Sequence, residues 1–304
     1  MVKTKEDFWK NKRVFITGNT GFKGSWLTLC LEQKGAIIGG YSLPCSEINL
    51  IYNSCKLNKT THQTFGDIRD EEKLKKSILE FSPDVILHLA AQPIVKYSYS
   101  DPKYTYETNV IGTLNVLNAG FECGKIKSII IVTSDKCYEN LEWEYGYRES
   151  DPLGGHDPYS SSKACCEILT SSFRRSYTKE NSPNVSTVRA GNVIGGGDWS
   201  DYRLIPDIIK SYKSTKEIEL RYPQATRPWQ HVLEPISGYL LLAEKLFNHK
   251  EFEGAFNFAS VEENCKPVLY LANKINSLLE NQLVIKANSA GNEHEANFLK
   301  LDSS

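Results

Sequence analysis

Two short segments carry side chains whose types and spacing could do chemistry together. The apolar run 129–133 predicts a buried strand that ends at a hydroxyl, a carboxylate and an amine. These three groups belong to Ser134, Asp135 and Lys136. Downstream, Tyr159 and Lys163 lie four residues apart, so a helix would place the phenol and the amine on one face. Because open α/β sheets bind ligands at the carboxyl ends of their strands, we expect the two segments to meet at one crevice.

The Tyr159/Lys163 pair has the spacing of an acid–base device. A phenol with a pKa of about 10 is a poor base at neutral pH, but a nearby ammonium favours the phenolate and lowers that pKa. Tyr159 could then take a proton from a substrate hydroxyl while a hydride leaves the same carbon, with Ser134 hydrogen-bonded to that hydroxyl. A tyrosine and a lysine at this spacing also occur on ordinary surface helices, so the surrounding segments decide between a catalytic pair and a surface pair.

A glycine-rich segment near the N-terminus predicts a dinucleotide site. It lies between the apolar run 13–17 and a stretch with helical spacing over 25–34, which a second apolar run, 36–41, follows. Strand, turn, helix and strand form a βαβ unit, in which the glycines let the backbone approach a pyrophosphate at the helix N-terminus. The segment comprises Gly18, Asn19, Thr20, Gly21, Phe22, Lys23 and Gly24.

The residues expected at the adenosine end do not show whether the cofactor carries a 2′-hydroxyl or a 2′-phosphate. The run 40–43 at the end of the second strand, which includes Ser42, has neither the acidic residue that holds a ribose nor the arginine that holds a 2′-phosphate. These residues therefore do not separate NAD from NADP. Asp67 and Ile68 close a third strand and could meet the adenine edge, although Asp67 is equally well explained as a turn aspartate.

The order of elements predicts an α/β fold, a Rossmann-like doubly wound parallel sheet with a smaller mixed C-terminal substrate lobe. Apolar strands alternate with helical stretches as far as residue 190, which we assign to a cofactor-binding domain, 1–190. From Gly191 the pattern changes to short strand-like pieces and helices, which we assign to a substrate lobe, 191–304. The expected strands are 13–17, 36–41, 63–65, 85–90, 129–133 and 185–189. The main helices are 25–34, 70–80 with Asp70 as its N-cap, 104–122 and 159–177. In the lobe we expect helices over 205–212, 235–247 and 269–279, and strand-like pieces at 219–222 and 255–258.

Composition excludes several classes of function. The 304 residues include 36 basic and 37 acidic ones, a net charge of -1 that gives no reason to expect nucleic-acid or membrane-surface binding. No apolar run is long enough to span a bilayer, and the charged residues 1–13 lack the core of a signal peptide. The eight cysteines form no CxxC pair and no metal-binding cluster, so we expect reduced thiols, no metal and a cytoplasmic location.

With these residues in place, the chain resembles the extended short-chain dehydrogenase/reductase family. The glycine segment, the run 88–91, the run 109–113 and the Tyr159/Lys163 pair carry the resemblance. Within that family the chain is similar to the sugar-nucleotide 4,6-dehydratases, and most of all to the branch that acts on CDP-glucose, through the runs 17–26, 133–138, 189–199 and 227–235. Members of the family continue beyond the region of Glu295, so we expect this chain to lack a C-terminal piece.

The resemblance implies a bound NAD and a homo-oligomer, a dimer or a tetramer, paired through the helices 104–122 and 159–177. Beyond the glycine segment, Ser42, Asp67 and Ile68, it assigns the cofactor four more contacts: Leu89, Ala90, Ala91 and Asn109. The implied reaction is redox-neutral: the sugar C4 hydroxyl is oxidised with Tyr159 as base, water leaves from C5 and C6, and hydride returns to C6. The product is a 4-keto-6-deoxy sugar for deoxysugar synthesis, such as that of cell-surface polysaccharide.

The resemblance also divides the elimination step between Asp135 as acid and Lys136 as base. Lys136 would need partial burial or a cationic neighbour to lose its proton, and Asp135 would need a raised pKa. The simpler alternative is a surface ion pair between the two residues.

Five residues are candidates for holding the nucleotide-sugar substrate. Arg227 and Arg203 could grip the diphosphate with their guanidinium forks, although Arg203 could also be a plain surface residue. Asn192, Gln92 and His231 complete the set. Trp199 and Trp229 are core aromatics or flank the base, and His88 receives no role.

Two other functions remain open from the sequence. One is a 4-epimerase or a dehydratase for a TDP-, GDP- or UDP-hexose, since no residue chemistry here specifies cytosine. The other is a non-catalytic regulator that senses a dinucleotide on the same fold.

Overall fold

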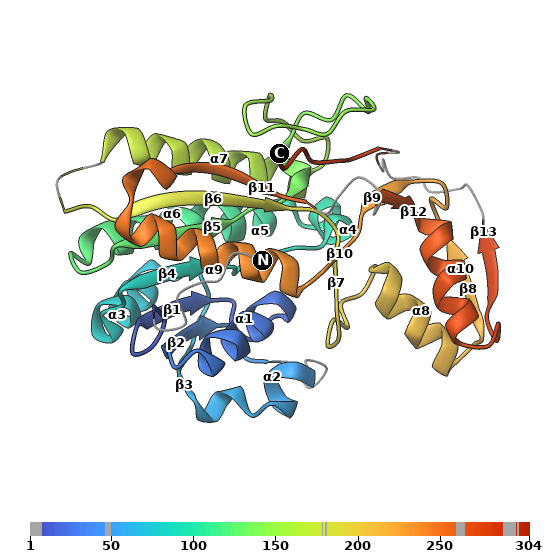
Figure 1. The fold of residues 1–304 in the computed structure, drawn as a ribbon, viewed down its shortest axis with the longest axis horizontal. Coiled ribbons are helices and arrows are strands. Elements are labelled where there is room, and N and C mark those ends of the chain that lie inside the picture. Colours follow the sequence, from blue (N-terminus) through green and yellow to red (C-terminus); the bar gives the residue numbers. More distant parts are fainter. Residues whose placement is uncertain are drawn as a thin grey trace.

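The computed structural model describes residues 8–45, 50–177, 179, 181–259, 265–287, 296 and 298–304. The start of the charged lead-in, 1–7, and most of the region around Glu295 lie outside the described residues. At the centre is a seven-stranded sheet in the order β11-β6-β5-β4-β1-β2-β3, with every pair parallel (Figure 1). Its strands are β1 Arg13–Thr17, β2 Ile37–Ser42, β3 Thr61–Phe65, β4 Val85–His88, β5 Ser128–Val132, β6 Asn184–Ala190 and β11 Gly254–Phe258. The predicted doubly wound parallel sheet is therefore confirmed.

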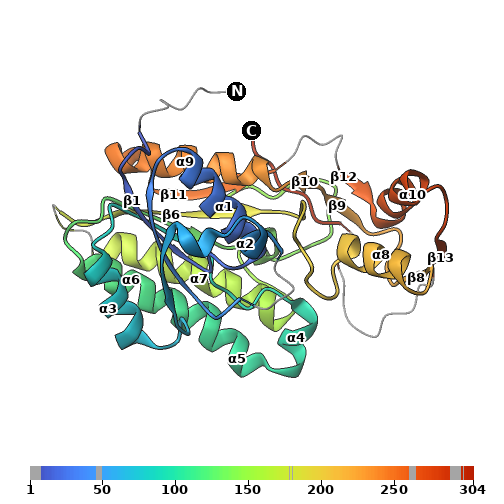
Figure 2. The same ribbon diagram turned by 90° about the horizontal axis from the view of Figure 1, so that it is seen from below.

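Helices cover both faces of this sheet, as Figure 2 shows. The helices α1 Phe22–Gln33 and α9 Leu233–Asn248 pack on one face, and α3 Glu71–Phe81, α6 Gly112–Glu122 and α7 Pro158–Ser176 pack on the other. Strand residues alternate between the two apolar layers: Val14 and Ile16 join the layer of α1, whereas Phe15 joins the layer of α3. Burial on both faces explains why the strands are continuous apolar runs.

Most predicted helices and strands are present, with one clear difference. Asp70 caps α3 as expected, because its side chain accepts the backbone N–H of Lys73 at 3.1 Å. The helix predicted over 104–122 is instead three pieces: α5 Pro102–Tyr106, a π-helical turn Glu107–Ile111, and α6. In that turn the Asn109 side chain accepts from the backbone N–H of Gln92 and donates to its carbonyl, which ties the turn to the segment after β4.

The C-terminal region contributes to both parts of the molecule. The strand β11 pairs with β6 at the edge of the large sheet, and α9 packs its apolar side on the same sheet, so both extend the Rossmann layer. A separate small lobe has its own apolar core around Ile208, Ile218 and Leu283. The lobe contains α8 Leu204–Lys213, α10 Val268–Leu278, β8 Glu217–Leu220, β9 Thr226–Pro228, β12 Cys265–Pro267 and β13 Val284–Ala287.

Short elements complete the described chain. They are α2 Leu50–Ser54, α4 Val95–Ser100, β7 Val193–Ile194, β10 Gln230–His231 and the 3-10 turns Leu57–Lys59, Asp135–Cys137 and Lys250–Phe252. No disulfide joins any of the eight cysteines, all of which are described. Within the described ranges, no helix has both the length and the apolar character that a membrane crossing requires.

Candidate active site

Two cavities meet at the carboxyl edge of the large sheet. The glycine-turn cavity, about 320 Å³, is lined by the turn between β1 and α1. The strand-end cavity, about 330 Å³, lies between the ends of β5 and β6 and the small lobe. Six residues line both cavities: Lys23, Pro93, Thr133, Tyr159, Asp198 and Arg203. A molecule bound in one cavity would therefore approach a molecule bound in the other beside Tyr159.

The glycine turn fits a dinucleotide because its backbone has no room for side chains. Gly18 has a φ of 73°, and a Cβ there would lie 2.7 Å from the backbone nitrogen of Ala90. A Cβ at Gly24 would lie 2.1 Å from the carbonyl oxygen of Gly18. The N-terminus of α1 opens directly into the cavity, where its N–H groups and dipole favour a pyrophosphate.

Most of the predicted cofactor residues line this cavity. Besides the residues of the turn other than Asn19, these are Ser42, Asp67, Ile68, Leu89, Ala90 and Ala91. The Asp67 carboxylate accepts hydrogen bonds from the backbone and guanidinium of Arg69, and these bonds lower the pKa of Asp67. Arg69 therefore favours the ionised form of Asp67, while Leu43 and Ile68 add apolar side chains to the cavity wall at this end.

Two predicted cofactor residues do not line the cavity. Asn19 is buried, and its amide donates to Gln63 Oε1 at 2.6 Å, so it braces the turn from behind. Asn109 is also buried, with its amide bonded to Gln92 and, at 2.8 Å, to Ser162 Oγ. Both side chains hold neighbouring segments together through their amide N–H groups, and their contact with the cofactor stays a prediction.

The two segments that could do chemistry meet at the junction of the cavities. Burial raises the pKa of Tyr159 to about 12, although hydrogen bonding with Ser134 and the charge of Arg203 oppose this rise. Burial lowers the pKa of Lys163, whose ammonium donates to the carbonyl of Val132 at 3.2 Å. The sequence predicted a lowered phenol pKa; in the protein's own surroundings the desolvation of Tyr159 outweighs its charged and hydrogen-bonding neighbours.

Asp135 is only 4% exposed, which rules out the surface ion pair. Its Oδ1 accepts the Ser134 hydroxyl at 2.9 Å, while its Oδ2 faces Gly191 without a hydrogen-bond partner among the described residues. Burial raises the pKa of Asp135 and outweighs the opposing charges of Lys136 and Arg227. A carboxyl group in this state can serve as an acid. Lys136 is half-buried and lines the same cavity.

Three of the five predicted substrate residues line the strand-end cavity: Asn192, Arg203 and Arg227. Arg227 is buried on β9 and lies near enough to influence Asp135. Arg203 precedes α8, with its Nε 3.7 Å from a carboxylate oxygen of Asp198. Its place in the wall of both cavities excludes the plain surface reading of Arg203.

The other two, Gln92 and His231, do not line this cavity, and their assignment to the substrate stays a prediction. The Gln92 amide donates to Thr105 Oγ1 at 2.9 Å and its oxygen accepts from the backbone of Ile94 at 2.6 Å, so both polar ends face the protein. His231 is exposed, lines neither cavity, and places its ring 6.3 Å from that of Trp26.

His88, which received no role, is a buried structural residue. Its two ring nitrogens are hydrogen-bonded to the hydroxyls of Thr17 and Thr113 at 2.6 and 3.0 Å. Burial lowers the pKa of His88 to about 3, and the charge of Lys163 lowers it further, so the ring is neutral. The partners are two threonine side chains, from β1 and α6.

Sequence reasoning missed part of the cavity wall. Asp198, from the glycine-rich loop after β7, lines both cavities, and the Gly195–Gly197 run that precedes it was the available signal. Lys23 was assigned to the cofactor alone, yet it also lines the strand-end cavity, where burial and the charge of Arg203 lower its pKa to about 8. Trp229 lines the strand-end cavity, whereas Trp199 is absent from its lining.

Comparison with known proteins relates the chain to sugar-nucleotide enzymes. The family model described as GDP-mannose 4,6 dehydratase matches residues 15–298. CDP-glucose 4,6-dehydratase of Salmonella typhimurium is 45% identical over 98% of this chain and 85% of its own length.

Solved structures share the fold at lower identity. A Bacillus anthracis dTDP-glucose 4,6-dehydratase, solved in complex with NAD, has a TM-score of 0.78 at 22% identity, over 96% of this chain and 88% of its own. A Thermotoga maritima UDP-glucose 4-epimerase, solved with UDP-glucose, has a TM-score of 0.83 at 20% identity, over 96% of this chain and 90% of its own.

Proposed function

The chain belongs to the GDP-mannose 4,6 dehydratase family, and we propose that it is an NAD-dependent lyase that converts CDP-glucose into CDP-4-keto-6-deoxyglucose. The observation that carries the proposal is the meeting of two pairs at the junction of two cavities. Tyr159 and Lys163 form the hydride-transfer pair, and Asp135 and Lys136 form the elimination pair. The assignment of CDP-glucose draws on the 45% identity to the Salmonella enzyme.

NAD supplies a hydride acceptor that later becomes the donor, together with a positive charge that favours the Tyr159 phenolate. The residues of the glycine turn would hold it, with its pyrophosphate at the N-terminus of α1 and its adenosine end near Ser42 and Ile68. The glycine turn fits this group because its backbone has no room for side chains: a Cβ at Gly24 would clash with the Gly18 carbonyl.

The chain's own residues then move three protons. Tyr159 takes the proton of the sugar C4 hydroxyl, which Ser134 holds by a hydrogen bond. Lys136 takes the C5 proton that the 4-ketone makes acidic and gives a proton back to C5 when the hydride returns to C6. Asp135, whose pKa is raised by burial, gives its proton to the C6 hydroxyl, which leaves as water. Arg227 and Arg203 hold the diphosphate within the strand-end cavity.

A panel of nucleotide sugars tests this proposal. The purified protein with NAD is offered CDP-, TDP-, GDP- and UDP-hexoses, and the products are identified by mass and by the keto group. We expect loss of one water from CDP-glucose and no net change in NAD. Turnover of TDP-glucose but not CDP-glucose would overturn the substrate, and a C4 epimer without water loss would replace dehydration by epimerisation.

We also propose that the chain forms a homo-oligomer through α7 and the α5–α6 segment. Ile168 on α7 is 57% exposed, and Ile111 in the π-helical turn is 45% exposed. A hydrogen bond between Tyr106 on α5 and Ser161 on α7 links the two segments. A second copy would bury these apolar side chains. Light scattering of Ile111→Glu/Ile168→Glu should give a monomer, whereas an unchanged mass would reject this interface.

Three further assignments belong to the same proposal. The small lobe around α8 and β8 holds the nucleotide, because it forms the wall of the strand-end cavity opposite the large sheet. The protein acts in the cytoplasm. Its product feeds the synthesis of deoxysugars for cell-surface polysaccharide.

A further inference from the structure

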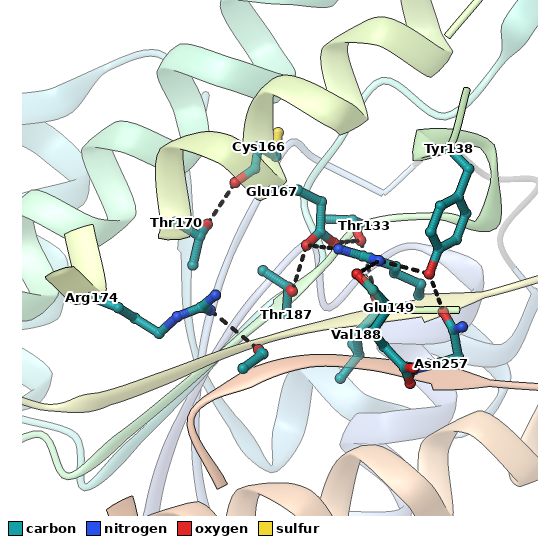
Figure 3. Close-up of polar contacts among 12 residues, drawn as sticks. Thr133, Tyr138, Glu149, Cys166, Glu167, Thr170, Arg174, Thr187, Val188 and Asn257 are labelled. Atoms are coloured by element: carbon teal, nitrogen blue, oxygen red, sulfur yellow. Dashed lines mark hydrogen bonds and ion pairs between the residues drawn. The ribbon is translucent and has the colours of Figure 1, made fainter. Parts of the chain in front are cut away.

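A buried ion pair lies behind the catalytic residues and has no part in the proton transfers above. Glu167 on α7 (Figure 3) and Arg189 on β6 are 2% and 3% exposed, with a guanidinium nitrogen and a carboxylate oxygen 2.8 Å apart. Burial lowers the pKa of Arg189, but the hydrogen bond and charge of Glu167 outweigh that effect, so the guanidinium stays charged. Because desolvating two charges offsets their attraction, such a pair is weak evidence of a stabilising role.

The carboxylate of this pair holds the residue that precedes the catalytic segment 134–137. Thr133 Oγ1 donates to Glu167 Oε1 at 2.5 Å, the length of a charge-assisted hydrogen bond. The backbone N–H of Thr133 donates to the carbonyl of Val188 at 2.9 Å. The chain is therefore fixed to α7 and to β6 one residue before Ser134.

The guanidinium holds the residue that follows the same segment. Arg189 Nη1 donates to the Tyr138 hydroxyl at 2.6 Å, and the guanidinium lies 4.8 Å from the centre of the Tyr138 ring. The Tyr138 hydroxyl in turn donates to Asn257 Oδ1 on β11 at 2.8 Å (Figure 3). The segment thus has both flanks attached to one ion pair.

We propose that the Glu167–Arg189 pair is a positioning device, which sets the catalytic segment 134–137 against Tyr159. Glu167 lies on the same helix as Tyr159 and Lys163, so the pair ties the helix that carries the hydride-transfer residues to the strand end that carries the elimination residues. The proposal rests on the proposed function for what the segment does. A displacement of about 1 Å at such a site can cost about 100-fold in rate.

Two threonines provide a matched test, because each donates to a different oxygen of the same carboxylate. Thr133 Oγ1 binds Oε1 next to the catalytic segment, and Thr187 Oγ1 binds Oε2 at 2.7 Å in the middle of β6. Both side chains are buried, so Thr133→Val and Thr187→Val each remove a hydroxyl that is bonded to Glu167. The Thr133 hydroxyl also lies 3.2 Å from the carbonyl oxygen of Val188, and Thr133→Val removes this contact as well. The holoenzyme variants are compared in thermal midpoint, kcat and KM, with the nucleotide hexose that the wild type turns over.

We expect both variants to lose similar amounts of thermal stability. Thr133→Val should lower kcat by about 10-fold to 100-fold at unchanged KM, whereas Thr187→Val stays within about 2-fold, a loss of about 0.4 kcal/mol. Thr133→Ser, which restores the hydroxyl, should recover kcat. Backbone amide exchange over 134–137 should quicken in Thr133→Val alone. This last readout needs no turnover, so a wrong substrate assignment does not count against the positioning role.

Equal kcat values for the two valine variants, or a loss confined to KM, would overturn the proposal. Unchanged amide exchange over 134–137 in Thr133→Val would do the same. If Thr133→Val does not fold, Tyr138→Phe replaces it, because that change keeps the ring and removes the hydroxyl that is bonded to Arg189 and Asn257. A Tyr138→Phe holoenzyme with wild-type kcat and KM would likewise reject the role.

Discussion

Replacing Asp135 by Asn should make the protein more stable at neutral pH while removing its activity. Burial raises the pKa of Asp135 in the folded chain, and its Oδ2 has no hydrogen-bond partner in the described part of the protein. In the unfolded chain the carboxyl ionises near its ordinary pKa of about 3.9. The stability that this group contributes is therefore complete below that value and is lost as the pH rises through the raised folded pKa. At pH 8 an ionised Asp135 costs stability that a neutral amide does not.

The size of the gain follows from the same observations. Each unit of pKa shift corresponds to about 1.4 kcal/mol, and a buried group without a partner costs about 1–3 kcal/mol. We expect Asp135→Asn to add about 1–3 kcal/mol at pH 8, which raises the melting temperature of a chain of this size by about 2–5 °C. At pH 5 the gain should shrink, because wild-type Asp135 then holds its proton more often.

Thermal unfolding at pH 5 and pH 8 with a fixed excess of NAD measures this gain, and product formation measures the activity. The loss of the acid should slow dehydration by about 100-fold to 10,000-fold. Asp70→Asn at the exposed N-cap of α3 is the control, since Asn caps as well as Asp and stability should stay within about 0.5 kcal/mol. An Asp135→Asn protein that is less stable than wild type at pH 8, or that still dehydrates the sugar at the wild-type rate, would refute the reasoning.

Three further substitutions separate the parts of the site. Lys136→Met should leave NAD binding intact and abolish water loss. Full dehydration by this variant in a product assay would reject the assignment of Lys136 as the base. Gly24→Ala places a Cβ 2.1 Å from the Gly18 carbonyl oxygen and should abolish NAD binding in a fluorescence titration, so a wild-type Kd would show that the turn does not hold the cofactor. Arg227→Met removes the buried guanidinium from the strand-end cavity and should raise the KM for the nucleotide sugar by about 10-fold to 100-fold, as expected for a lost charge-assisted contact of about 1.5–3 kcal/mol; an unchanged KM would assign the diphosphate elsewhere.

Local patterns were enough to predict the scaffold of the site. The alternating apolar runs predicted the parallel strands, because a strand buried on both faces is apolar throughout. The capping role of Asp70 could also be predicted from local sequence, because a carboxylate just before a helical run accepts the first N–H groups of the helix. Contacts between distant segments could not be predicted from local patterns. The amide of Gln92 donates to Thr105, and His231 lies outside both cavities.

The sequence by itself determined the glycine turn, the strand that ends at Ser134 and the spacing of Tyr159 and Lys163, because each depends on residues close together in the chain. Only the tertiary structure decided that β11 joins the large sheet and that Asp135 is buried with a raised pKa. It also decided that one ion pair holds both flanks of the catalytic segment. These features depend on desolvation and on contacts between distant residues, which come into being when the strands and helices pack together.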